Sequence, residues 1–68
     1  MNELIIDALW EKAEAAVKSL RRDLIHEAIG AMRAAVELDL VSYRNVRDIE
    51  EYLVRDTLNN PQYKNLLS

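Results

Sequence analysis

Residues 3–38 read ELIIDALWEKAEAAVKSLRRDLIHEAIGAMRAAVEL, and this stretch decides the fold. Its apolar residues recur at steps of three and four, which places them on one face of a helix. Gly30 is the only glycine, and no proline interrupts the stretch. The apolar stripe comprises Ile6, Leu9, Ala13, Ala16, Val17, Leu20, Leu24, Ala28, Ala31, Ala35 and Leu38. We therefore expect an all-α protein built as a small helical bundle.

A second apolar row begins near Leu24 and widens the buried arc to about half the helix circumference. This row comprises Ile25, Ile29, Met32 and Val36. A helix that is apolar over so wide an arc needs two neighbours. Because a later helix of the chain supplies only one of them, the row predicts a surface that binds another protein or a second copy of the chain.

Two layouts are open for the first half of the chain, which begins with Asn2 as the expected cap. One is a single helix over about 3–38, and the other is a pair of helices that break near 19–22. Ser19 is the only cap-like residue at that point, and the stripe keeps its phase across it, which favours continuity. A continuous helix would be roughly 54 Å long and would require an oligomer, whereas a break permits a monomer.

The second half predicts one helix over about 43–58 and a short one over about 61–67. Ser42 and Asn45 are both good caps for the first of these helices. Its expected core face comprises Val46, Ile49, Leu53 and Thr57. An Asn-Pro pair then stops this helix and begins the last one, because proline is favoured at the first helical position.

The composition indicates one small intracellular domain. The chain has 68 residues and no cysteine, so neither disulfides nor a thiolate zinc site can support its core. The first residues are acidic, and no apolar run approaches the roughly 18 residues of a membrane span. We therefore expect a soluble, cytoplasmic protein without a membrane partner. The formal net charge of −3 disfavours nucleic acid as a general partner.

The sequence contains no catalytic or metal-binding motif. His26 is the only histidine, and Asp23 can share its helix edge. Carboxylate metal sites in helical bundles draw Glu-x-x-His pairs from two helices together with further glutamates, which this single pair does not supply. A nucleophile would also need a positioned base and an oxyanion stabiliser. We expect a non-enzymatic protein with no cofactor and no metal.

One segment resembles the second half of a helix-turn-helix motif. Residues 35–38 would end its first helix, and a serine would cap the recognition helix. The resemblance implies DNA contacts from Ser42, Tyr43, Arg44 and Arg47. The turn lacks the usual glycine, and three acidic residues between 48 and 51 would repel phosphate. A DNA-binding regulator is therefore the alternative hypothesis.

The first hypothesis is a protein-interaction or oligomerisation module, such as an adaptor, an inhibitor or a small subunit, with a homodimer favoured. Packing of the wide apolar helix face against a partner helix would supply the driving force. Trp10 lies at the edge of the stripe, where its ring either closes the core or anchors the partner. The expected interface residues are Ile25, Ile29, Met32, Val36 and Trp10.

Overall fold

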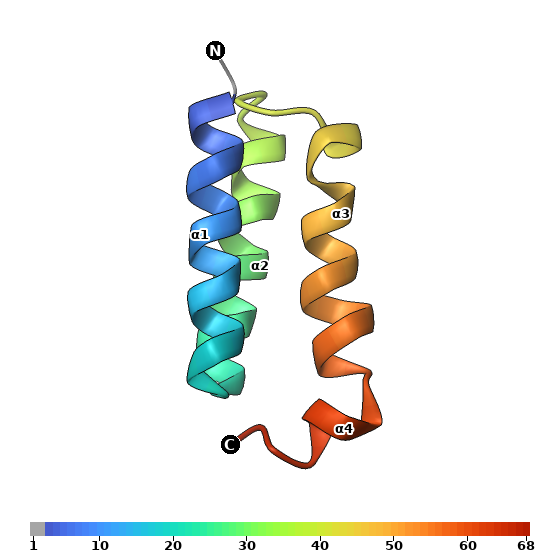
Figure 1. Ribbon diagram of the computed structural model, residues 1–68. Coiled ribbons are helices and arrows are strands. Elements are labelled where there is room, and N and C mark those ends of the chain that lie inside the picture. Colours follow the sequence, from blue (N-terminus) through green and yellow to red (C-terminus); the bar gives the residue numbers. More distant parts are fainter. Residues whose placement is uncertain (1–2) are drawn as a thin grey trace.

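Three long helical segments lie side by side, each running opposite to the one before it, and a short fourth helix lies at one end of them (Figure 1). The computed structural model describes residues 3–68, so the predicted Asn2 cap lies outside the described residues. The elements are α1 Glu3–Ser19, α2 Arg22–Glu37, α3 Tyr43–Leu53, the π-helical segment η1 Val54–Leu58 and α4 Pro61–Lys64. Within residues 3–68 all regular elements are helical, which confirms the predicted all-α bundle.

The chain breaks between α1 and α2, so the layout with two helices is the observed one. Leu20 adopts the left-handed conformation with φ 56°, which ends the right-handed helix. The Ser19 hydroxyl donates to the Ala16 carbonyl oxygen (2.6 Å) and accepts from the Arg21 amide (3.2 Å). The hydroxyl thereby satisfies a carbonyl oxygen and an amide that would form backbone hydrogen bonds if the helix continued. The stripe keeps its phase because only two residues separate the helices, and both helices face the same core.

Ser68 holds this turn from the other end of the chain. Its amide donates to the Leu20 carbonyl oxygen (3.0 Å), and its carbonyl oxygen accepts from the Arg22 amide (3.2 Å). The Arg22 amide is one of the first in α2 and has no partner within its own helix. A contact between residues far apart in sequence therefore supports the break, which explains why local signals left both layouts open.

α2 is covered on two sides, by α1 and by α3. The buried apolar residues are Leu9, Ala13, Ala16, Val17, Ile25, Ala28, Ile29, Met32, Ala35, Val41, Val46, Ile49 and Leu53. The predicted core face of the third helix is confirmed, since its three apolar members and Thr57 are all buried. The second neighbour that the sequence required for α2 is therefore α1, which the break allows to fold back.

A Schellman motif ends α2 and turns the chain toward α3. The Leu40 amide donates to the Ala35 carbonyl oxygen (2.9 Å), and the Asp39 amide donates to the Val36 carbonyl oxygen (3.0 Å). Asp39 takes the left-handed position of the motif with φ 59°. Ser42 occupies the predicted cap position of α3, but its side chain makes no capping hydrogen bond.

The helix predicted over 43–58 is helical throughout, but its last turn is a π-helix. The Asn59 amide donates to the Val54 carbonyl oxygen five residues earlier (2.8 Å). The Thr57 hydroxyl donates to the Tyr52 carbonyl oxygen (2.8 Å), which leaves this buried hydroxyl satisfied. The side chain takes a carbonyl that the backbone ladder would otherwise use, and the turn widens around it.

α4 starts as the sequence predicts and ends earlier. The Asn60 side chain accepts a hydrogen bond from the Gln62 amide (2.9 Å), and Pro61 is the first helical residue. The helix covers Pro61–Lys64 rather than about 61–67. The chain then turns, so that Leu67 packs against the core while Leu66 remains exposed.

Candidate protein-interaction surface

Three of the residues expected to bind a partner form the centre of the protein's own core. Ile25, Met32 and Ile29 are 0%, 1% and 7% exposed, so they are not available to a partner in this structure. The expectation assigned α2 one internal neighbour, whereas α1 and α3 both cover it. These three residues are therefore corrected from interface to core.

The other two expected interface residues lie at the core edge. Val36 and Trp10 are partly buried and pack against the buried cluster. The Trp10 ring contacts the Tyr52 ring with centroids 5.7 Å apart and planes inclined by 44°, a tilted geometry that aromatic pairs favour. Trp10 therefore closes the core between α1 and α3.

Large apolar side chains remain exposed mainly at the end where α1 begins and α2 ends (Figure 1). Leu4 is 80% exposed and Leu38 is 70% exposed. Leu40, in the turn between α2 and α3, and Tyr43, the first residue of α3, lie at the same end and are also exposed. Exposed apolar clusters with polar surroundings mark interaction surfaces more often than isolated leucines do.

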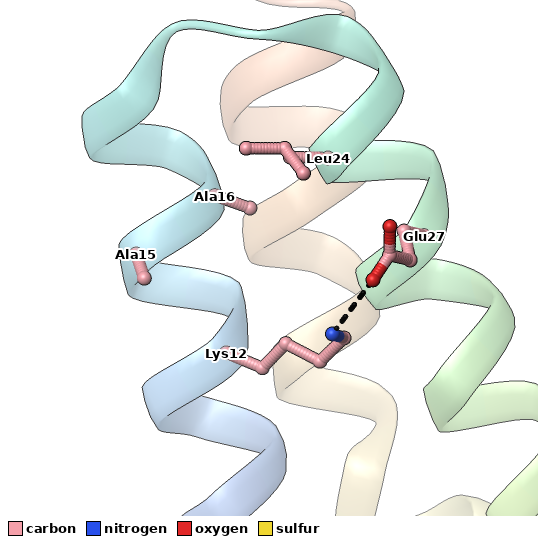
Figure 2. A pocket seen from close by; sticks show the side chains of 5 residues that line it. All are labelled: Lys12, Ala15, Ala16, Leu24 and Glu27. Carbon is pink, nitrogen blue, oxygen red and sulfur yellow. Dashed lines mark hydrogen bonds and ion pairs between the residues drawn. The ribbon is translucent and has the colours of Figure 1, made fainter.

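A hollow of about 150 Å³ lies between α1 and α2, on the side turned away from α3 (Figure 2). Ala15 and Ala16 form its α1 wall, and Leu24 projects from α2 beside them. Lys12 and Glu27 reach toward each other across the boundary, with Nζ and Oε1 3.0 Å apart. This ion pair shows the register in which the two helices face each other.

The same register extends the boundary beyond the hollow. Since Lys12 lies opposite Glu27 and the helices are antiparallel, Ala8 lies opposite Ala31, and Leu4 lies near the end of α2. Steps of three and four keep each row on one side of its helix. We call this surface the outer groove; it comprises Leu4, Ala8, Lys12, Ala15, Leu24, Glu27, Ala31, Ala34 and Leu38.

Charge differs between the two ends of the outer groove. Residues 34–41 include Glu37 and Asp39 but no lysine or arginine, and these acids stand at the negative end of the α2 dipole. At the other end, residues 18–22 include Lys18, Arg21 and Arg22 but no acid. Arg21 is paired with the next acid, Asp23 (2.8 Å), so the end with the hollow carries charges of both signs, whereas the end with the exposed leucines is acidic.

A second hollow, of about 300 Å³, lies between α2 and α3 and is mainly charged. Its lining comprises Arg33, Glu50, Glu51, Val54 and Arg55. The Tyr43 hydroxyl donates to the Glu50 carboxylate (2.6 Å), and this bond raises the pKa of Tyr43 above its ordinary value. Charges of both signs line this hollow, so its chemistry favours neither an apolar partner nor an anionic ligand.

The four residues of the DNA-binding alternative all lie on the surface, at the start of α3. α2 and α3 run side by side in opposite directions (Figure 1), whereas a helix-turn-helix motif crosses its helices at about 90–120°. The turn residues therefore do not present α3 in the orientation that the motif uses. Ser42, Tyr43, Arg44 and Arg47 are surface residues without that motif's geometry.

Across residues 3–68, no group of three histidine, cysteine, aspartate or glutamate side chains could hold a metal ion. Asp23, considered beside His26, instead accepts a hydrogen bond from Arg21 (2.8 Å). The described helices also include none that is both long and apolar enough to cross a membrane.

Sequence reasoning missed most of the outer groove. It placed Ala31 and Leu38 in the core stripe and gave no role to Leu4, Ala8 or Ala34. The available signal was the seven-residue spacing from Leu24 through Ala31 to Leu38, which continues beyond the core side of α2. No protein-family model, curated protein or solved structure matches this chain.

Proposed function

We propose that this protein is a protein-interaction module that binds a helix in the outer groove. The observation that carries the proposal is the exposure of Leu4 and Leu38 beside a row of alanines, on a bundle whose core is already closed by its own helices. Burying a leucine side chain contributes about 1.5–3 kcal/mol, so leaving two of them in water favours a partner that covers them.

Small side chains suit the groove to a helix. Ala8, Ala31 and Ala34 leave the backbones of α1 and α2 accessible along the middle of the surface. Helices pack with their axes about 8–10 Å apart, and small residues favour the short end of that range. The Lys12–Glu27 pair is partly exposed, which leaves both groups able to bond to a partner's polar side chains.

Site-specific photo-cross-linking in cells that express the protein tests this proposal. A photoreactive phenylalanine replaces Ala34, which lies in the groove, and in a matched control replaces Asp48, which is exposed on α3. We expect adducts from position 34 and not from position 48. Leu38→Asp in the position-34 protein should reduce the adducts roughly tenfold, the equivalent of about 1.4 kcal/mol at a contact hot spot.

Equal adducts from the two positions, or none from position 34, would contradict the proposal. Adducts that Leu38→Asp does not reduce would also contradict it, because Leu38 is the most exposed leucine at that end of α2. Retained helicity of the variant in circular dichroism excludes unfolding as the cause of a loss.

A further inference from the structure

The turn between α1 and α2 is made of residues that favour a helix over a turn. It contains neither glycine nor proline, and Leu20 adopts the left-handed conformation, which is unfavourable for a residue with a Cβ atom. The apolar stripe keeps its phase through this point, from Val17 to Leu20 and Leu24. On one continuous helix the same residues would therefore still lie on a single side.

Ser68 occupies two backbone groups that a continuous helix would pair at this point. Its amide donates to the Leu20 carbonyl oxygen (3.0 Å), which a continuous helix would pair with the Leu24 amide. Its carbonyl oxygen accepts from the Arg22 amide (3.2 Å), which a continuous helix would pair with the Lys18 carbonyl oxygen. The Ser68 contact and the continuous helix therefore exclude each other.

The segment that makes this contact is attached to the bundle by few apolar contacts. α4 contains no buried residue, and Leu66 is 60% exposed. Leu67 is partly buried and packs against the core. Segments with few buried apolar contacts open locally before the rest of a fold. We call residues 65–68 the latch, because they close the turn and can detach while the three long helices stay packed.

We propose that the turn between α1 and α2 is a hinge, and that two chains exchange their first helices when the latch releases it. α1 and α2 then form one continuous helix over about residues 3–37. α1 of each chain packs against α2 and α3 of the other, as it packs against its own α2 and α3 in the closed chain. A two-fold axis at the middle of the long helix keeps neighbouring helices antiparallel.

The exchange conserves the core and changes the turn. Trp10 remains against Tyr52, although the two rings then belong to different chains. The open form gains the hydrogen bonds of the continuous helix and relieves Leu20, whereas the closed form keeps the latch and avoids the cost of association. Short hinges under strain favour such exchange. The balance therefore depends on a few groups at the turn, and single substitutions there should shift it.

Sedimentation velocity of the full chain, refolded from urea at about 10 μM and at about 1 mM, measures the exchange through its mass action. Ser68→Pro removes the amide that donates to Leu20, and it should raise the dimerisation constant at least roughly tenfold because both copies lose the bond. Ser68→Ala is the matched control. It keeps this amide and should change the constant by less than about threefold.

Substitutions inside the turn test the hinge itself. Leu20→Gly, added to Ser68→Pro, should lower the dimerisation constant roughly tenfold, since glycine accepts the left-handed conformation and disfavours the continuous helix. Ser19→Ala should raise the constant of the wild type, because it removes the hydroxyl that accepts from the Arg21 amide and adds a strong helix former. Leu38→Asp should leave the constant unchanged, which separates the exchange from association through the outer groove.

Nuclear magnetic resonance identifies the exchanged contact. Isotope-labelled and unlabelled chains of Ser68→Pro are mixed in urea and refolded together at about 1 mM. Isotope-filtered spectra of the dimer should connect the Trp10 ring of one chain with the Tyr52 ring of the other, since their centroids lie 5.7 Å apart. A dimer without exchange would show this contact only within each chain.

A Ser68→Pro protein that is helical in circular dichroism and monomeric at millimolar concentration overturns the inference. Equal constants for Ser68→Pro and Ser68→Ala, or a dimer without the contact of Trp10 and Tyr52 between chains, overturn it too. If Ser68→Pro loses its helicity, Ser19→Ala takes its place, and a folded but monomeric Ser19→Ala is equally decisive. The outer groove has no part in the exchange, so these outcomes leave the proposed function standing.

Discussion

Two residues in the turns of the bundle adopt a conformation that their side chains disfavour. Leu20 and Asp39 have φ values of 56° and 59°, in the left-handed region that glycine enters without a steric cost. Each supplies the position that reverses the chain at the end of a helix. At Asp39 a second cost adds to this, because its carboxylate stands at the negative end of the α2 dipole.

Replacing Asp39 with glycine should therefore stabilise the fold. We expect Asp39→Gly to raise the free energy of unfolding by about 0.5–1 kcal/mol, since the relief of strain and of dipole repulsion exceeds the entropy that glycine adds to the unfolded chain. Urea denaturation measures this difference. Asp39→Ala serves as the control, because it removes the charge but keeps the Cβ atom, and it should gain less than glycine. A larger gain for alanine would show that strain at this position is unimportant.

The environment of Tyr52 predicts that the free energy of unfolding falls at alkaline pH. Burial, followed by the charges of Glu14 and Tyr63, raises the pKa of Tyr52 above its ordinary value of 10.0. A folded-state pKa above the unfolded one contributes stability that is present below pH 10 and is lost as the pH rises through the folded value. Tyr52→Phe should therefore lose less stability than the wild type between pH 9 and pH 11. Equal losses in the two proteins, measured by urea denaturation, would contradict this assignment.

Each long helix combines one face that the core covers with one that it leaves open. On α2 the covered face reaches from Ile25 to Ala35, and Gly30 stands on the open side, where an added Cβ would meet no atom within 4 Å. The glycine is therefore not required by packing within the chain. It weakens the helix because it has more backbone freedom to lose on folding.

Gly30→Ala tests this reading of α2. The substitution should stabilise the chain by about 0.8–1 kcal/mol, the difference in helix propensity between the two residues. Thermal unfolding followed by circular dichroism measures the shift, and Ala34→Gly on the same exposed side should produce a change of similar size and opposite sign. An unchanged or lower melting temperature for Gly30→Ala would mean that position 30 contacts something the single chain does not contain.

At the scale of the whole molecule, each long helix packs against the other two, and α2 contributes more buried residues to the core than either of the others. Domains of this size have a stability of roughly 3–10 kcal/mol, so one severe core defect is enough to unfold them. Ile29, one of the residues expected at an interface, is a core residue that is only 7% exposed. Substitutions at Ile29 therefore change the stability of the fold.

Ile29→Asp should therefore abolish the fold rather than release a partner from a folded chain. An unpaired carboxylate in the core costs several kcal/mol, which matches the whole stability of the domain. Far-ultraviolet circular dichroism should show loss of helix in the purified protein, whereas Ile29→Val should cost about 0.5–1.5 kcal/mol and remain folded. If the Ile29→Asp variant remained fully helical, Ile29 could not be buried in the core, and the packing described above would be contradicted.

The local sequence was sufficient to predict which segments are helical and which side of α3 faces the core. Val46, Ile49, Leu53 and Thr57 are buried as their spacing predicts. Asn60 caps α4 as its position before proline predicts. Periodicity and capping act within a few residues, so a single sequence contains them in full.

Only the tertiary structure decided where the first helix breaks and which apolar residues stay exposed. The Ser68 contact that supports the break joins residues far apart in the chain, and the covering of Ile25 follows from that break. The periodicity of apolar residues shows which side of a helix is apolar, but it does not show which neighbouring helix covers that side. Leu38 continues the same stripe as Ala35, yet Leu38 is exposed and Ala35 is buried, so the spacing alone does not tell how far along the helix the core extends.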